Sequence, residues 1–151
     1  MAQPPDNTPV SSVVDQAMET ASPMILITLS YVEGALVEHG YAIEQHPRER
    51  LAREDAWTLS VLSADGLPSN VGIWLDERAE PTDAPVHVNP AVRMVNAHDQ
   101  TLFELRYIGD TDAPIWIDAR DVPGLLHALT AFRHNLAERV DQALNRLHHN
   151  R

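Results

Sequence analysis

The last thirty residues carry the strongest periodic signal in the chain. Asp121-Val122-Pro123-Gly124 opens this segment with a residue type that caps helices and a proline that suits the first helical turn. Apolar side chains then recur at a mean spacing of roughly 3.7 residues, close to the period of an α-helix. These are Leu125, Leu129, Phe132, Leu136, Val140, Ala143 and Leu147. The pattern predicts one long amphipathic helix that ends near His148.

A helix of this length has a consequence for assembly. At 1.5 Å per residue it would be roughly 40 Å long, whereas a typical strand spans only about 17–20 Å. The outer apolar residues of a helix that overhangs its sheet need another cover. We therefore expect the chain to associate with a second copy or with another protein. The residues expected at the seam on this helix are Leu136, Val140, Leu144 and Leu147.

Length and composition indicate a single domain. The 151 residues are enough to bury a hydrophobic core, and no internal repeat or domain boundary appears. Residues 1–8 are rich in Pro, Gln and Asn and are predicted to be a disordered tail, which leaves residues 9–151 as one α+β domain. No stretch reaches the ~18–20 apolar residues that span a bilayer, and the N-terminus does not resemble a secretory signal. A cytoplasmic location is expected.

Several classes of chemistry are excluded by residue types that are missing. The chain has no Cys, which rules out disulfides, thiolate metal sites and a thiol nucleophile. All eleven cationic side chains are Arg, so Schiff-base chemistry and a phosphate-binding lysine are excluded as well. The sequence contains no Gly-x-Ser-x-Gly motif, and its six glycines are too scattered to form a phosphate-binding loop. We therefore expect no cofactor and favour a protein that is not an enzyme.

Charge is placed unevenly. The formal net charge is −11, and residues 1–47 carry six acids and no Lys or Arg. Such an acidic segment argues against binding to nucleic acid or to an anionic membrane, both of which require positive charge. It is compatible with a basic protein partner. The six acids are Asp6, Asp15, Glu19, Glu33, Glu38 and Glu44.

Two helices are expected before the sheet. Thr8-Pro9 and Ser22-Pro23 each place a good N-cap residue before a proline that suits the first turn. We therefore predict helices over residues 10–20 and 24–39, the second ending at the natural C-cap residue Gly40. The first six residues of the second helix would also suit a buried strand, because periodicity does not separate the two for short apolar runs. We favour the helix.

The middle of the chain predicts an antiparallel sheet. Short segments with apolar alternation are separated by turn residues such as Asp65-Gly66, residues 96–100 and the hairpin loop 109–114. Asn89-Pro90 is expected to break or bend its strand, since proline donates no ladder hydrogen bond. The expected strand segments are residues 41–43, 57–63, 71–75, 86–88, 91–95, 101–108 and 115–117. Short connections favour a meander of about five strands, flanked by the N-terminal helices and the long C-terminal helix.

The densest polar cluster surrounds the last predicted strand. Asp110, Asp112 and Asp118 lie close together in the sequence, and oxygen-rich loops can bind Ca²⁺ or Mg²⁺. A divalent-metal-dependent enzyme that uses these three acids, with His98 or His127 as a base, is one interpretation. The favoured interpretation is structural, because acids at such positions shape turns and cap helices. The motif of a helix–loop–helix calcium site fails at Pro114 and Ile115.

Two tryptophans are expected on the second face of the sheet. Trp74 and Trp116 alternate with the Ile and Leu residues that flank them, so they should point away from the core. If the helices cover only one face, these tryptophans form an exposed interaction patch with Leu62 and Ile108. If a helix covers each face, they are buried. Both alternatives remain open.

These observations favour a small, non-enzymatic protein-binding or assembly protein. We expect it to be a homodimer that self-associates through the C-terminal helix, with no nucleic-acid or membrane partner. An alternative is an acidic inhibitor or immunity-type protein that occludes a basic protein partner.

Overall fold

The computed structural model describes residues 10–47, 57–78 and 85–149. The elements follow in the order α1 (Val10–Thr20), α2 (Ser22–Glu38), β1 (Ala42–Gln45), β2 (Thr58–Leu62), β3 (Pro68–Glu77), β4 (His87–Asn96), β5 (Thr101–Arg106), β6 (Ile117–Asp118), α3 (Val122–Arg133) and α4 (Leu136–His149). Five strands form an antiparallel meander in the order β1-β2-β3-β4-β5, and β6 pairs with β4. The predicted α+β class and meander are confirmed. The predicted N-terminal tail lies outside the described residues.

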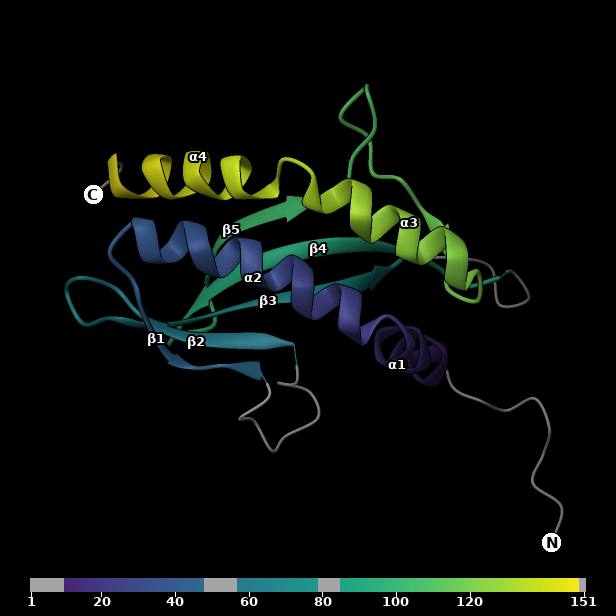
Figure 1. Cartoon of the computed structure of the whole chain (residues 1–151), viewed down its shortest axis with the longest axis horizontal. Coiled ribbons are helices and arrows are strands. Elements are labelled where there is room, and N and C mark those ends of the chain that lie inside the picture. The colour runs from purple at the N-terminus through teal and green to yellow at the C-terminus, as the bar shows by residue number, and fades with distance from the viewer. Residues whose placement is uncertain (1–9, 48–56, 79–84, 150–151) are drawn as a thin grey trace, which may run out of the picture.

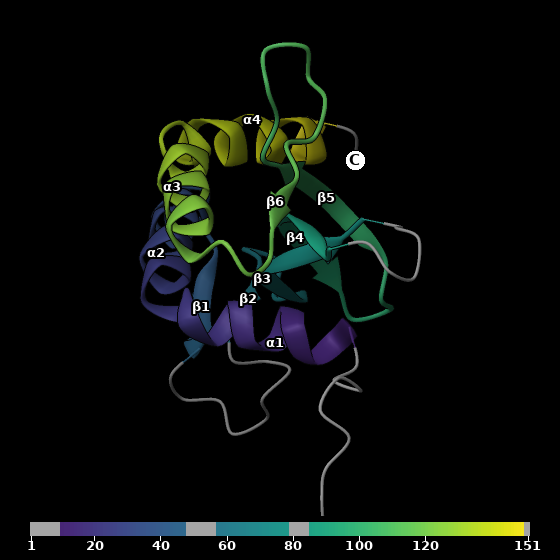
Figure 2. The same ribbon diagram turned by 90° about the vertical axis from the view of Figure 1, so that its right-hand side faces the viewer.

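The helices form a layer against one side of the sheet (Figure 1). Contacts join α2 to β1 and β3, α3 to β4 and β6, and α4 to β5. Figure 2 shows α2 and α3 on one side of the strands, with α4 and α1 at the two ends of the layer. Between helices and sheet lies the core, whose largest fully buried side chains include Ile25, Leu36, Ile73, Met94, Leu129, Phe132 and Leu144.

The C-terminal segment forms two helices, which corrects the prediction of a single one. Between α3 and α4 the N–H of His134 donates to the carbonyl of Ala131, only three residues back, at 3.2 Å. The normal pattern resumes when the N–H of Arg139 donates to the carbonyl of Asn135 at 3.1 Å. Asn favours helix starts over helix interiors, because its side chain competes for nearby backbone groups. The chain bends at this point, so α4 follows the sheet and the predicted overhang does not occur (Figure 1).

The apolar stripe itself is confirmed across the bend. Six of its seven residues are buried, and Leu147 is partly buried against the core. Asp121 caps α3 as expected, because its carboxylate accepts a hydrogen bond from the N–H of Gly124 at 3.1 Å. The stripe therefore packs against the chain's own sheet and is buried in its core.

The ends of α2 match the sequence at one terminus only. Gly40 has a φ of +88°, and its N–H donates to the carbonyl of Val37 at 3.0 Å. Tyr41 donates to the carbonyl of Leu36 at 3.1 Å, which completes a glycine-terminated C-cap and confirms that prediction. At the N-terminus Ala21 occupies the cap position, and the hydroxyl of Ser22 accepts from the Trp57 indole at 3.1 Å instead. The other predicted cap, Thr8-Pro9, lies outside the described residues.

β4 runs straight through Asn89-Pro90, where the sequence predicts a break. The carbonyl of Pro90 accepts from the N–H of Tyr107 at 3.0 Å. The N–H and C=O of one strand residue point to the same edge, so the missing N–H of Pro90 also faces this edge. Pro90 lies between the part of β4 that pairs with β5 and the part that pairs with β6. Proline is therefore tolerated because no ladder hydrogen bond is lost at this position.

Asn89 holds together the two arms of the hairpin that follows β5, one at Tyr107 and the other at Ile115. Its side chain is fully buried, and its amide nitrogen donates to the carbonyls of Tyr107 at 2.7 Å and Ile115 at 3.0 Å. Its carbonyl oxygen accepts from the Arg106 guanidinium at 3.3 Å. The hairpin loop between these arms projects from the sheet (Figure 2). The last strand, predicted over residues 115–117, is instead β6 at Ile117–Asp118, so the prediction was right at Ile117 only.

We expect Asn89→Ala to lower the free energy of unfolding by roughly 1–3 kcal/mol, because the carbonyl of Ile115 loses the Asn89 donor and the carbonyl of Tyr107 keeps only the N–H of Ile115. Urea denaturation followed by circular dichroism measures the change. Asn145→Ala, at an exposed position of α4, is the matched control and should change stability by less than about 0.5 kcal/mol. Equal small effects of the two substitutions would contradict the role given to Asn89.

Candidate functional site

The outward side of α2 is apolar. Ile25, Val32 and Leu36 on the inward side are fully buried, whereas four large hydrophobic residues on the other side remain between 38% and 53% exposed. We call these four the outer α2 face: Leu26, Ile27, Tyr31 and Val37. The described chain has six exposed large hydrophobic residues in all, so most of them lie on this one helix.

The composition of α2 explains this exposure. Its seventeen residues include two charged side chains, Glu33 and Glu38. A helix that is hydrophobic on all sides is normally buried on all sides. The signal is therefore present in the sequence as the lack of a polar side between Met24 and Val37, but the clearer periodicity of residues 125–147 points to the C-terminal helix instead.

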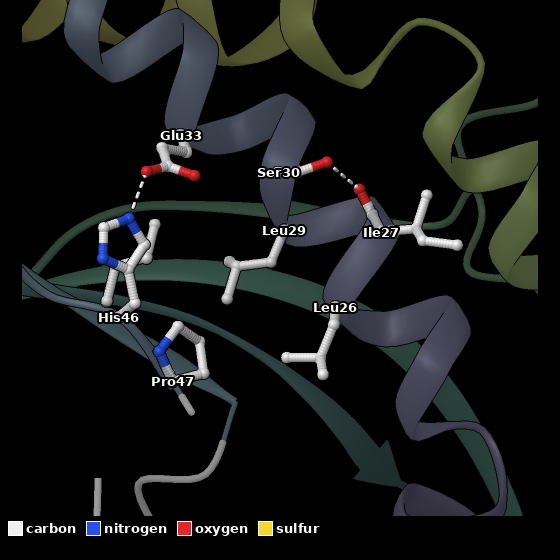
Figure 3. Close-up of a pocket in the computed structure, with 8 residues that line it drawn as sticks. Leu26, Ile27, Leu29, Ser30, Glu33, His46 and Pro47 are labelled. Atoms are coloured by element: carbon white, nitrogen blue, oxygen red, sulfur yellow. Dashed lines mark hydrogen bonds and ion pairs between the residues drawn. The ribbon is translucent and has the colours of Figure 1, made fainter. Parts of the chain in front are cut away.

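Two small residues lie along the outer α2 face one helical turn apart. Ser30 donates its hydroxyl back to the carbonyl of Ile27 at 2.5 Å, so this hydroxyl is satisfied within the helix (Figure 3). A Cβ added at Gly34 would meet no atom within 4 Å. Glycine costs an exposed helix interior about 1 kcal/mol relative to alanine, and it allows another backbone to approach closely. The face therefore combines bulky apolar side chains with a shallower strip at the small residues Ser30 and Gly34.

A cavity of about 290 Å³ adjoins this face where α2 passes the end of β1. Leu29 and Leu59, which are both buried, belong to its lining. Leu26 and Pro47 line its flanks (Figure 3). At the edge of the cavity the Glu33 carboxylate lies 2.6 Å from the His46 ring.

The two flanks of the outer α2 face carry opposite charges. On the β1 side lies Glu33, whose side chain is 29% exposed. On the α3 side, the guanidinium of Arg133 lies 5.6 Å from the centre of the Tyr31 ring and donates to the Met24 sulfur at 3.4 Å. The surface is thus apolar along its middle, acidic on one flank and basic on the other.

Most of the residues predicted to form a seam on the C-terminal helix lie in the interior of the chain. The side chains of Leu136, Val140 and Leu144 are fully buried in the chain's own core, and Leu147 packs against it. A seam between two copies needs exposed side chains; Leu136, Val140 and Leu144 offer none in this structure, and Leu147 is only partly exposed.

The second sheet face carries the two predicted tryptophans, both half-buried. Trp74 pairs with Ala91 on this face, as its parity predicts, and the guanidinium of Arg93 lies 5.7 Å from its ring centre. A Cβ on Gly72 would lie only 2.9 Å from the Trp74 ring, so glycine makes room for it. Trp116 lies just before β6 and has Arg78 at 5.9 Å from its ring centre. Leu62 and Ile108, the other expected patch residues, are half-buried as well.

This face is polar because four charged side chains close a ring of ion pairs on it. Arg93 bonds to Asp76 and, at 2.5 Å, to Glu104. Arg106 bonds to Asp76 at 2.8 Å and to Glu104 at 2.9 Å. We call Asp76, Arg93, Glu104 and Arg106 the charge ring. Two positive and two negative charges satisfy one another, so the sheet can face water here without a second helix layer.

The acids predicted as metal ligands do not assemble. Asp110 and Asp112 lie in the projecting loop, where Asp112 has a φ of +61°, and the Asp118 carboxylate accepts from the N–H of Arg120 at 2.9 Å. Within the described ranges, no group of three or more His, Asp or Glu side chains is placed to hold a metal ion, and this includes His98 and His127.

Comparisons with protein families, with curated proteins and with solved structures found no significant match to this chain. Among the described residues no single helix is long and apolar enough to cross a membrane, although residues 13–20 and 22–38 pass the length and composition test as a pair bent by 71°.

The charge ring predicts how stability depends on pH. Burial raises the pKa of Glu104, but the hydrogen bond and charge of Arg93, together with Arg106, outweigh this, and the pKa lies below its ordinary value. A depressed folded-state pKa contributes stability above the unfolded-state pKa of about 4.3 and loses it as the pH falls through the folded-state value.

We therefore expect Glu104→Gln to destabilise the protein at pH 7 by at most about 1 kcal/mol, since the ring is partly exposed, and the difference from wild type should shrink below about pH 4. Urea denaturation across this pH range is the measurement. Glu77→Gln removes a carboxylate from the exposed end of β3 and is the control. A Glu104→Gln effect that does not change with pH would show that the ion pairs are not its source.

Proposed function

We propose that this chain is a non-enzymatic assembly protein that forms a homodimer through the outer α2 face. The observation that carries the proposal is the exposure of Leu26, Ile27, Tyr31 and Val37 on one helix. Apolar surface concentrated in this way favours association, at about 25 cal/mol for each Å² removed from water. The proposal keeps the self-association expected from the sequence and moves its seam from the C-terminal helix to α2.

The opposite charges of the two flanks favour a second copy as the partner. In a dimer whose two-fold axis runs along α2, the α3 flank of one copy faces the β1 flank of the other. Arg133 of each copy then approaches Glu33 of the other, so the two-fold axis forms this pair of opposite charges twice. A uniformly basic or acidic partner would satisfy one flank and repel the other.

The shape of the surface is also complementary to a second copy of itself. In the same arrangement Tyr31 of one copy, on the α3 side, faces the cavity on the β1 side of the other. The cavity of about 290 Å³ exceeds the ~150 Å³ that is known to accept a benzene ring. Ser30 and Gly34 on the line between them allow the helices to approach closely.

Native mass spectrometry and light scattering should find wild-type protein at twice the chain mass of 16.8 kDa. The double variant Ile27→Glu, Val37→Glu should run as a folded monomer, because two charges would be buried without partners. The matched control is Leu67→Glu, which changes an equally exposed residue in the turn between β2 and β3 and should leave the dimer intact.

A second control separates the two possible seams. Val140→Glu places a charge in the chain's own core, so it should lower the melting temperature rather than selectively dissociate the dimer. Wild-type protein that stays monomeric at every concentration, or a double variant that stays dimeric, would refute the proposal.

The alternative of an acidic inhibitor retains one supporting observation. Residues 10–47 carry no Lys or Arg, and Asp15, Glu38 and Glu44 are exposed on α1, α2 and β1. Carboxylates in this arrangement can steer a basic protein surface toward α2.

For this alternative we expect micromolar binding to a basic nuclease that weakens at least tenfold between 0.05 and 0.5 M salt, order-of-magnitude values for a screened electrostatic contact. Isothermal titration calorimetry measures it, and Asp15→Asn with Glu44→Gln should mimic the effect of salt. Binding that is insensitive to both changes would count against this mechanism.

A further inference from the structure

A second cavity lies where α3 meets α4. Its volume is about 280 Å³, and it is bounded by the segment that leaves β5 and by the helix bend. Tyr107 and Phe132 contribute aromatic walls, with ring centres 6.2 Å apart. The polar side chains in its lining are Asp110, His134, Asn135 and Arg139.

Arg139 is the unusual member of this lining. One of its terminal nitrogens donates to the carbonyl of Arg106 at 2.9 Å, and its guanidinium lies 6.0 Å from the centre of the Phe132 ring. A guanidinium has five N–H donors, so one hydrogen bond leaves most of them free. Among the described residues no carboxylate lies within ion-pair distance of Arg139, whereas Arg93 and Arg106 each have two.

The electrostatic state of Arg139 agrees with this geometry. Burial lowers the pKa of Arg139, and the charge of Asp112 offsets part of that effect from a distance. The cation is thus partly removed from water without a direct counter-ion. The hydrogen bond to the carbonyl of Arg106 and the contact with the Phe132 ring hold the guanidinium in place, so less side-chain entropy remains to be lost when an anion binds.

We propose that this cavity binds an organic carboxylate, with Arg139 as the anchor through its free N–H donors. Planar carboxylates match the guanidinium fork with two parallel hydrogen bonds. Asp110 at the rim disfavours a dianion such as phosphate. The same acid can accept from an N–H group next to the carboxylate, and the aromatic walls suit an apolar side chain. This combination describes an α-amino acid, either free or as the C-terminal residue of a peptide.

Three probes test the proposal on the full-length wild-type chain by isothermal titration calorimetry and by NMR shifts of the His134 and Asn135 amides. N-acetyl-L-phenylalanine should bind at least about tenfold more tightly than N-acetyl-L-phenylalaninamide, which lacks the carboxylate. Free L-phenylalanine is the third probe. Preference for the free amino acid over its acetylated form would identify a free amino acid as the ligand, and the reverse would identify a peptide C-terminus.

Arg139→Lys should weaken binding of the preferred carboxylate by at least about tenfold, because lysine keeps the charge but loses the planar fork. Arg146→Lys, on the same helix but outside the cavity, should leave binding unchanged. No binding of any probe, equal binding of the acid and the amide, or equal binding by the two variants would overturn the proposal. The acid-to-amide comparison on wild-type protein keeps the test valid even if Arg139→Lys fails to fold.

Discussion

The buried amide of Asn89 decides where one edge of β4 stops pairing with β5 and starts pairing with β6. Its donations to the carbonyls of Tyr107 and Ile115 hold the two arms of the intervening segment together. Three features depend on these hydrogen bonds of Asn89. The proline that follows can remain inside a strand, the loop between the arms projects from the sheet, and Tyr107 is held where it forms a wall of the Arg139 cavity. One side chain thus links sheet topology to a candidate ligand site.

The bend at His134 and Asn135 is the second local event with long-range effects. It lets α4 turn and bury Leu136, Val140 and Leu144 against the chain's own sheet. The same bend places Arg139 one turn into α4, where it reaches the carbonyl of Arg106 at the end of β5. A straight helix, which the apolar periodicity alone predicts, would have left the apolar residues of α4 beyond the sheet. The need for a partner on that helix disappears once the bend is present.

Local patterns predicted what local physics determines. The apolar stripe, the Asp121 cap, the Gly40 C-cap and the turn residues at Gly66 and Asp99 each depend on interactions within a few residues, and the structure contains all of them. The fold class and meander order followed from short connections between alternating segments. The predicted break at Pro90 was wrong. The free-energy cost of proline in a strand depends on whether a neighbouring strand would accept a hydrogen bond from its N–H, and the local sequence does not show which strands are neighbours.

The candidate surfaces were harder to predict for the same reason. The apolar sequence of α2 predicts that most sides of this helix are buried. Only the tertiary fold shows which side remains exposed to water. The Arg139 cavity joins residues 107–110 to residues 131–139, and no spacing rule connects these segments. In each case the chemistry was present in the sequence and the juxtaposition was supplied by the fold.

The two open surfaces of the molecule differ in how they tolerate water, and this difference bears on which one binds a partner. On the second sheet face the charge ring leaves no net charge within the ring, and arginines cover part of Trp74 and Trp116. On the outer α2 face Arg133 covers part of Tyr31 in the same way, but the aliphatic side chains of Leu26, Ile27 and Val37 remain 38–53% exposed. A polar face gains little free energy from contact, whereas an apolar face gains in proportion to the area that it removes from water. This difference supports the proposal that association uses α2, while the sheet face can remain solvated.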